Sequence, residues 1–201
     1  MAEKDVKKNP KDAAAWKVLA QGYQGKNRDS DAIKAYGSYL KLRPKDTSAL
    51  SQLGALWVTV YDERVTAFNS ARVELQALTG PTGAGTGLIG AQIIQDPLRQ
   101  PAIDEATQKA NDAYYQLARA AGKVVSSYHR YAGAIPKSRP AEKAQVEFQL
   151  AQSAIHVGDY QTAIDALKSF IRLVPSDPLV RDVRKQLRAL EKEKAKLQKS
   201  S

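Results

Sequence analysis

One apolar pattern occurs twice in the 201-residue chain, once near each end, and it restricts the fold more than any other feature. Residues 13–46 and residues 144–177 fit one 34-residue template: a helix, a tight turn, a second helix and then a proline. In both copies apolar residues recur three or four positions apart, which is the spacing of one face of a helix. A single helix pair of this kind cannot bury its own apolar face, so neighbouring pairs must stack on it. The pattern therefore predicts an all-α protein.

The two copies carry small, aromatic and proline residues at matching template positions. The first copy contains Ala13, Trp16, Leu19, Ala20, Tyr23, Ala32, Tyr36, Pro44 and Asp46. The second contains Ala144, Leu150, Ala151, Gly158, Asp159, Tyr160, Ala163, Leu167, Phe170, Pro175 and Asp177. This pattern resembles the tetratricopeptide repeat (TPR) family. The resemblance implies a TPR-like α-solenoid, a right-handed superhelix of antiparallel helix pairs, with a C-terminal capping helix.

Between the two clear copies the template weakens, and we expect one TPR-like domain over residues 1–201. Local signals place helix ends: Asp12 and Asp46 are suited to cap helices, and Pro44 ends the helix that begins near Ser30. For residues 103–135 both one long helix and two helices broken near Gly122 remain open. The expected parts are clear repeats 13–46 and 144–177, degenerate repeats 47–79 and 103–137, a Gly/Pro-rich insertion 80–101, and a basic capping helix 178–199.

The family resemblance implies a non-catalytic scaffold or adaptor that binds a peptide or partner protein in a concave groove. In the family, this groove is lined mainly by the first helix of each repeat. Lys17 matches a carboxylate-binding position of some members, but Gln21 and Gln52 stand where those members have Asn, so this chain departs from that clamp. The groove candidates of this chain are Lys17, Gln21, Gln24, Ser51, Gln52, Phe148, Gln149, Gln152 and His156. A solvated helix face is the alternative interpretation of these polar side chains.

Basic residues gather at the two ends of the chain. Of the net charge of +10, residues 1–46 and 178–201 each contribute +5, and residues 47–177 are neutral. This distribution indicates either an anionic partner, nucleic acid or lipid headgroups, or a charge that keeps the ends of a repeat array soluble. The candidates for contacting an anionic surface are Arg181, Arg184, Lys185 and Arg188.

The terminal helix also carries a narrow apolar seam, which permits a weak homo-oligomer as one option. Lys194 occupies a heptad position of that seam and would keep such a contact shallow. The adjacent aromatic residues Tyr114 and Tyr115 cannot both face inward on one helix, so at least one of them should be exposed. The seam consists of Val180, Val183, Leu187, Leu190 and Leu197.

The sequence predicts no enzyme, no cofactor and no metal site. The chain has no cysteine, which excludes disulfides and thiolate ligands. The glycines of GPTGAGTG are not followed by the Lys-Ser/Thr of a phosphate-binding loop. His129 and His156 have no second histidine or glutamate at a metal-binding spacing.

The sequence leaves two cellular locations open for the protein. No run approaches the ~20 apolar residues that span a bilayer, and residues 1–10 lack the apolar stretch of a signal peptide. The chain as given therefore indicates a cytoplasmic protein. If an N-terminal anchor precedes it, the alternative is a membrane-anchored, extracytoplasmic assembly factor of the cell envelope.

Overall fold

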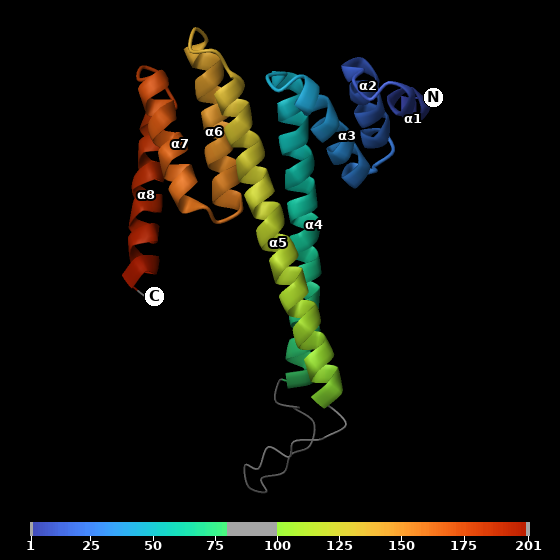
Figure 1. Cartoon of the computed structure of the whole chain (residues 1–201). Coiled ribbons are helices and arrows are strands. Elements are labelled where there is room, and N and C mark those ends of the chain that lie inside the picture. Colours follow the sequence, from blue (N-terminus) through green and yellow to red (C-terminus); the bar gives the residue numbers. More distant parts are fainter. Residues whose placement is uncertain (1, 80–99, 200–201) are drawn as a thin grey trace, which may run out of the picture. The chain divides into compact units, whose positions relative to one another are not determined.

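The computed structural model describes residues 2–79 and 100–199, and every regular element within these ranges is an α-helix (Figure 1). The prediction of an all-α protein is therefore confirmed. Most of the Gly/Pro-rich insertion lies outside the described residues. The helices are α1 (Ala2–Lys8), α2 (Ala13–Gln24), α3 (Asp29–Leu42), α4 (Thr47–Thr79), α5 (Gln100–Ala134), α6 (Pro140–His156), α7 (Tyr160–Leu173) and α8 (Val180–Lys199).

The chain divides into two compact units. Unit 1 consists of Met1–Val60 and Ala121–Ser201, and unit 2 consists of Tyr61–Ala120. Unit 2 is thus inserted in the sequence of unit 1. Because the unit boundaries fall inside α4 and α5, each of these two helices contributes residues to both units.

The helix ends follow the predicted caps. The carboxylates of Asp12 and Asp46 accept hydrogen bonds from the backbone N–H groups of Ala15 and Ala49, at 3.1 and 3.0 Å. These bonds satisfy donors that a helix N-terminus leaves unpaired. Helix α3 ends at Leu42, just before the proline at position 44 that cannot continue it.

The turn between α6 and α7 is built in the same way. Gly158 has a φ of 77°, a left-handed conformation that glycine adopts without steric cost. The carboxylate of Asp159 then accepts a hydrogen bond from the N–H of Thr162 at 3.0 Å and so caps α7. Both residues belong to the second copy of the 34-residue pattern, in which a tight turn joins the two helices.

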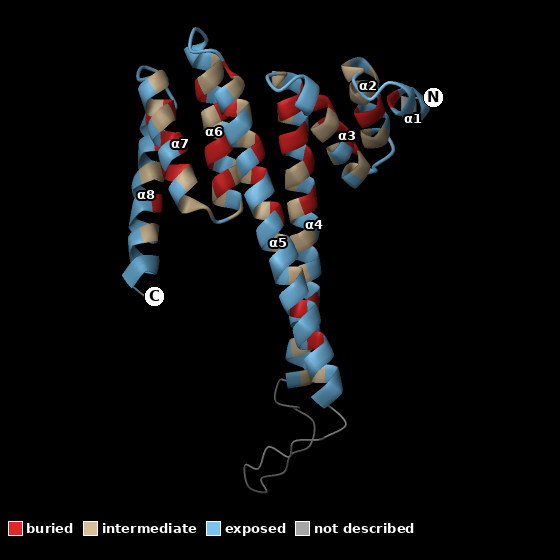
Figure 2. Cartoon of the chain, viewed as in Figure 1, coloured by how far each residue is buried: buried red, intermediate tan, exposed pale blue. Residues whose placement is uncertain are grey.

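Unit 1 has two large apolar clusters and a small third one, and the end of α5 packs against both large clusters. Buried residues are red in Figure 2. The first cluster joins α1, α2, α3 and the start of α4, and the second joins α6, α7 and α8. Tyr131 and Ala134 pack against the first cluster, whereas Val125 and Tyr128 pack against the second. Unit 1 is therefore held together through α5.

Unit 2 is a helix pair with a core of small side chains. Among its described residues, 61–79 and 100–120, the buried ones are all alanines, namely 71, 106, 110 and 120, while Phe68 and Leu117 are half-buried. The rings of Phe68 on α4 and Tyr114 on α5 lie 6.0 Å apart between centroids. Alanine at these positions lets two helices approach closely, but it buries little apolar surface for each residue.

Two helices differ from what the sequence predicted, and a third decides between the two alternatives that the sequence left open. Residues 47–79 form one continuous helix instead of a two-helix repeat, because no proline or turn sequence interrupts them after Gly54. Residues 103–135 follow the one-helix alternative: α5 continues through Gly122, since one glycine costs a helix only about 1 kcal/mol. Helix α1 was not predicted; its Val6 is buried in the first cluster.

Candidate partner-binding surfaces

The first helices of the N-terminal part, α2 and the start of α4, are joined by an amide pair. The side-chain N–H of Gln24 donates to the side-chain oxygen of Gln52 at 3.0 Å. The hydroxyl of Tyr36 on α3 donates to the amide oxygen of Gln24 at 3.3 Å. Two predicted groove residues are thus brought together, and both can still exchange hydrogen bonds because Gln52 is exposed and Gln24 half-buried.

The C-terminal part repeats this arrangement. The amide of Gln152 on α6 donates to the amide oxygen of Gln186 on α8 at 3.3 Å. Gln186 was not among the sequence candidates, since no template copy was assigned to α8. The sequence does contain an indication of this residue, because Gln186 lies one repeat length, 34 residues, after Gln152.

The side chain of Lys17 forms its ion pair within the protein. Its ammonium lies 2.9 Å from the carboxylate of Asp46, which also accepts a hydrogen bond from the hydroxyl of Tyr39. The hydrogen bond that Lys17 donates to the carboxylate of Asp46 raises the pKa of Lys17. Partial burial raises the pKa of Asp46, but hydrogen bonds from Tyr39, the Ala49 N–H and Lys17 outweigh that effect and lower this pKa to about 2. Lys17 therefore ties α2 to the N-terminus of α4.

The remaining groove candidates differ in how accessible they are. Gln21 on α2 is exposed, and Ser51 on α4 is half-buried. Phe148 is half-buried, and its ring packs 5.6 Å from that of Phe170 in the C-terminal cluster. The other candidates on α6, all exposed, are Gln149, Gln152 and His156.

The four basic candidates lie around one depression at the start of α8. This depression has a volume of about 420 Å³, and the turn over residues 175–178 supplies its other side. Lys185 pairs with Asp182 at 3.2 Å. Within the described part of the chain the other three basic residues form no ion pair: Arg181, Arg184 and Arg188.

The apolar seam of the terminal helix is largely used inside the protein. Val180, Val183 and Leu190 are buried in the C-terminal cluster, and Leu187 packs against it. Lys194 hydrogen-bonds to Gln161 on α7. A contact between two copies through this seam would have to displace α7, so self-association through α8 stays an untested prediction.

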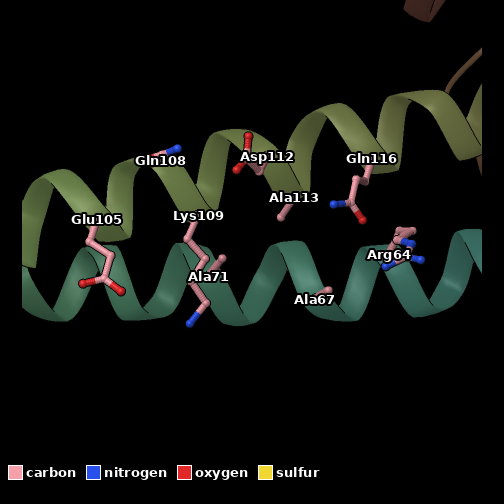
Figure 3. Close-up of a pocket in the computed structure, with 9 residues that line it drawn as sticks. All are labelled: Arg64, Ala67, Ala71, Glu105, Gln108, Lys109, Asp112, Ala113 and Gln116. Carbon is pink, nitrogen blue, oxygen red and sulfur yellow. The ribbon is translucent and has the colours of Figure 1, made fainter.

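Unit 2 carries a groove that the sequence did not indicate. It has a volume of about 410 Å³ and runs between α4 and α5, as Figure 3 shows. On the same unit Tyr114 and Tyr115 are 55% and 70% exposed, which confirms the expectation for this aromatic pair. The groove is lined by Arg64, Ala67, Ala71, Glu105, Gln108, Lys109, Asp112, Ala113 and Gln116.

Two chemical features are not found in the part of the chain that the structure describes. Its residues contain no group of three or more His, Cys, Asp or Glu side chains placed to hold a metal ion. Across the same ranges, no helix combines the length and apolar character that crossing a membrane requires.

Comparisons with known proteins leave the family open. No family model matches the chain, and no curated protein matches it. Among solved structures, one similar chain is the crystal structure of MamA protein. It is 15% identical, the match covers 90% of this chain and 86% of that one, and the TM-score is 0.24. A TM-score this low carries no argument about fold or function.

Proposed function

We propose that the protein is a non-catalytic scaffold in which unit 1, a short TPR-like α-solenoid, holds a segment of a partner protein on its first helices. The proposal assigns the two weak copies of the pattern to a single repeat. Its first helix is residues 47–60 of α4, and its second helix is residues 121–134 of α5. Unit 2 is then an insertion within that middle repeat.

Burial at matching positions supports this split repeat. Val124 and Tyr128 occupy the template positions of Ala32 and Tyr36, and the proline at position 136 corresponds to the one at 44. Val124 is fully buried, and Tyr128 packs between helices. A Cβ added to Gly54 would lie 3.1 Å from the ring of Tyr128, so the small template position is where these two helices approach closely.

The boundaries of unit 1 within α4 and α5 give the split repeat its strongest support. The first segment of unit 1 ends at Val60 in α4, and its second segment begins at Ala121 in α5. In the repeat at 144–177 the corresponding positions are occupied by residues 157 and 160, with Gly158 and Asp159 as the turn between them. A two-residue turn joining 60 to 121 would therefore restore a repeat of ordinary length.

The amide pairs support a ligand-binding face on the first helices. Gln24 with Gln52, and Gln152 with Gln186, connect successive first helices at 3.0 and 3.3 Å. Amide side chains both donate and accept, so they can pair with the backbone of an extended or helical segment. The helices that carry them are already held in place by the cores, so little ordering cost falls on the scaffold when a segment binds.

The test compares two double variants of the full chain in affinity capture from source cells. Gln52→Glu with Gln149→Glu adds two charges to the proposed face. Ser30→Glu with Ala189→Glu adds the same charge at exposed positions of α3 and α8. We expect the first variant to lose bound proteins that the wild type and the second variant retain. Equal retention by both variants would argue against this face.

A second candidate function is binding to a phosphate-bearing surface through the start of α8. The observation that favours it is the clustering of three arginines without ion pairs around one depression. Guanidinium groups bind phosphate oxygens in pairs of hydrogen bonds. Duplex DNA and vesicles containing phosphatidylserine would distinguish nucleic acid from lipid as the source of the phosphates.

The salt dependence of binding tests this second candidate. Replacing Arg181, Arg184 and Arg188 with Gln should weaken binding and reduce the slope of log K against log salt by about 3, one for each lost phosphate contact. Replacing Lys192, Lys196 and Lys199 with Gln removes the same charge farther along α8 and serves as the control. Equal effects of the two triple variants would show general electrostatic attraction instead of a site.

A further inference from the structure

We propose that the segment held by unit 1 is an extended stretch of the partner without charged side chains, recognised through its backbone groups. This inference rests on the proposed function, because it names the kind of segment that the first helices bind. Three properties of these helices support it: the near absence of charge, the hydrogen-bonding groups that they expose, and the scarcity of exposed apolar side chains.

Charged residues are nearly absent from the first helices of the N-terminal part. Helix α2 and residues 47–60 of α4 contain one charged residue, Lys17, although 26% of the chain is charged. The second helix α3, which is of similar length, contains four. The ammonium of Lys17 is paired with Asp46 at 2.9 Å, so it is neutralised within the protein.

The exposed positions of the first helices carry amides and hydroxyls. Every exposed residue of α2, of residues 47–60 and of residues 144–155 in α6 is uncharged. A solvated helix face usually carries lysine and glutamate at such positions, whereas the centre of an interface is depleted in charge. The exposed polar residues of these stretches are Gln21, Ser48, Gln52, Thr59, Gln145, Gln149 and Gln152.

A charged side chain of a partner would be unfavourable on this face. It would lose water without gaining an ion pair, and an unpaired charge costs far more to bury than an amide. Lys17 could pair with a carboxylate of the partner only by leaving Asp46, which also accepts a hydrogen bond from Tyr39. The side chains that contact the face are therefore uncharged.

The amide pairs keep hydrogen-bond donors available. Gln52 and Gln186 each accept a bond with the side-chain oxygen, and their NH2 groups donate to no described residue. Each NH2 group has two donors. An extended segment offers backbone C=O and N–H groups that have no partner within the segment, whereas a helix has already paired most of its own. Exposed glutamines thus match an extended segment.

The first helices offer little to the apolar face of a helical segment. Helices that dock in grooves use several apolar anchors at positions i, i+3, i+4 and i+7. Among the large apolar residues that are exposed, Val18 alone lies in α2, in residues 47–60 or in α6. Phe148 is half-buried and packs against Phe170 in the C-terminal cluster. This scarcity favours an extended segment over an amphipathic helix.

The spacing of the first helices sets the length of the segment. Packed helices lie about 8–10 Å apart, and an extended chain rises about 3.3 Å per residue. Each step from one first helix to the next therefore takes about three residues. A segment that crosses α2, the start of α4, α6 and α8 has about nine residues.

Charges of both signs on the face test the inference in the full chain, with extract of the source cells as the probe. One double variant carries Gln52→Glu and Gln149→Glu, and the other carries Gln52→Lys and Gln149→Lys. We expect both to lose the same bound proteins by at least about tenfold, since either charge would face an uncharged segment. Raising NaCl from about 50 mM to about 500 mM should leave wild-type retention unchanged, because no ion pair is screened.

The matched controls place the same two signs at the exposed positions Ser30 and Ala189, and both should retain these proteins. Circular dichroism shows whether each variant is folded. Opposite effects of the two signs on the face, or elution by salt, would overturn the inference and leave the proposed function in place. Retention of every protein by both face variants would remove the proposed function and this inference together.

A synthetic peptide tests the backbone contacts. Cross-linking from p-benzoylphenylalanine in place of Gln21 identifies the bound segment, which is then made as a peptide. N-methylation removes one backbone donor without adding charge, so at alternate positions it should weaken binding about three- to tenfold. No effect at any position, or a gain of helical circular dichroism on binding, would overturn recognition of an extended backbone.

Discussion

The carboxylate of Asp46 joins three helices of unit 1, and its removal gives a stability effect that depends on pH. Its pKa of about 2 lies below the ordinary value of 3.8. The difference corresponds to about 2.4 kcal/mol at pH 7 if the unfolded chain has the ordinary value. About a fifth of the side chain is exposed, 21%, so solvent screening reduces this to about 1–2 kcal/mol.

We predict that Asp46→Asn lowers the free energy of unfolding by about 1–2 kcal/mol at pH 7. Asparagine still caps a helix, so the loss reports the ionic contacts with Lys17 and Tyr39 and not the cap. Because the folded-state pKa is lowered, this stability is present above pH 3.8 and is lost as the pH falls toward 2. By pH 3 the difference between the wild type and the variant should fall to about half.

Urea unfolding followed by circular dichroism at pH 7 and pH 3 measures this difference. Asp12→Asn is the matched control, because Asp12 caps α2 but forms no ion pair or side-chain hydrogen bond with a lysine or tyrosine among the described residues. We expect this control to change stability by only a few tenths of a kcal/mol. An Asp46→Asn effect as small as that of the control, or one equal at both pH values, would refute the role assigned to the Asp46 contacts.

Further stability changes follow from the packing, each measured by urea unfolding. Gly54→Leu should destabilise by at least about 1–3 kcal/mol, because it forces atoms into the Tyr128 ring. Its control, Gly22→Ala, should stabilise by up to about 1 kcal/mol, since its added Cβ meets nothing within 4 Å. Gly158→Ala should cost about 1 kcal/mol or more through its φ of 77°. Leu167→Ala should cost about 2–5 kcal/mol. A stabilising Gly54→Leu or Gly158→Ala, a destabilising Gly22→Ala, or a neutral Leu167→Ala would contradict the packing described.

The sequence predicted those parts of the fold that have local signals. Caps such as Asp12, breakers such as Pro44 and turns such as Gly158 each act on residues within one helical turn. The helices of the two clear copies, α2 with α3 and α6 with α7, were found for this reason, whereas α1 was not. The middle lacks such signals, so apolar spacing alone could not tell one long helix from a helix pair. The contact of Gly54 with Tyr128 joins residues 74 positions apart, and no local pattern gives that pairing.

The candidate sites show the same limit. Lys17 matches a ligand-binding position in sequence, yet Asp46, 29 residues later, holds its ammonium. In the sequence, the charges of unit 2 resemble those of any solvated helix. Which of these charges line one groove depends on how α4 and α5 pack against each other. The basic cluster was found because all four of its residues lie on one helix.

The split of the middle repeat is the central claim, and excision of unit 2 tests it most directly. Residues 61–120 are replaced by Gly-Asp, the turn found at positions 158 and 159. The account predicts a soluble, helical protein that unfolds cooperatively in urea, because residues 47–60 and 121–138 can then close an ordinary repeat. An unfolded or molten product, with unit 1 intact in sequence, would contradict the split repeat and with it the proposed solenoid.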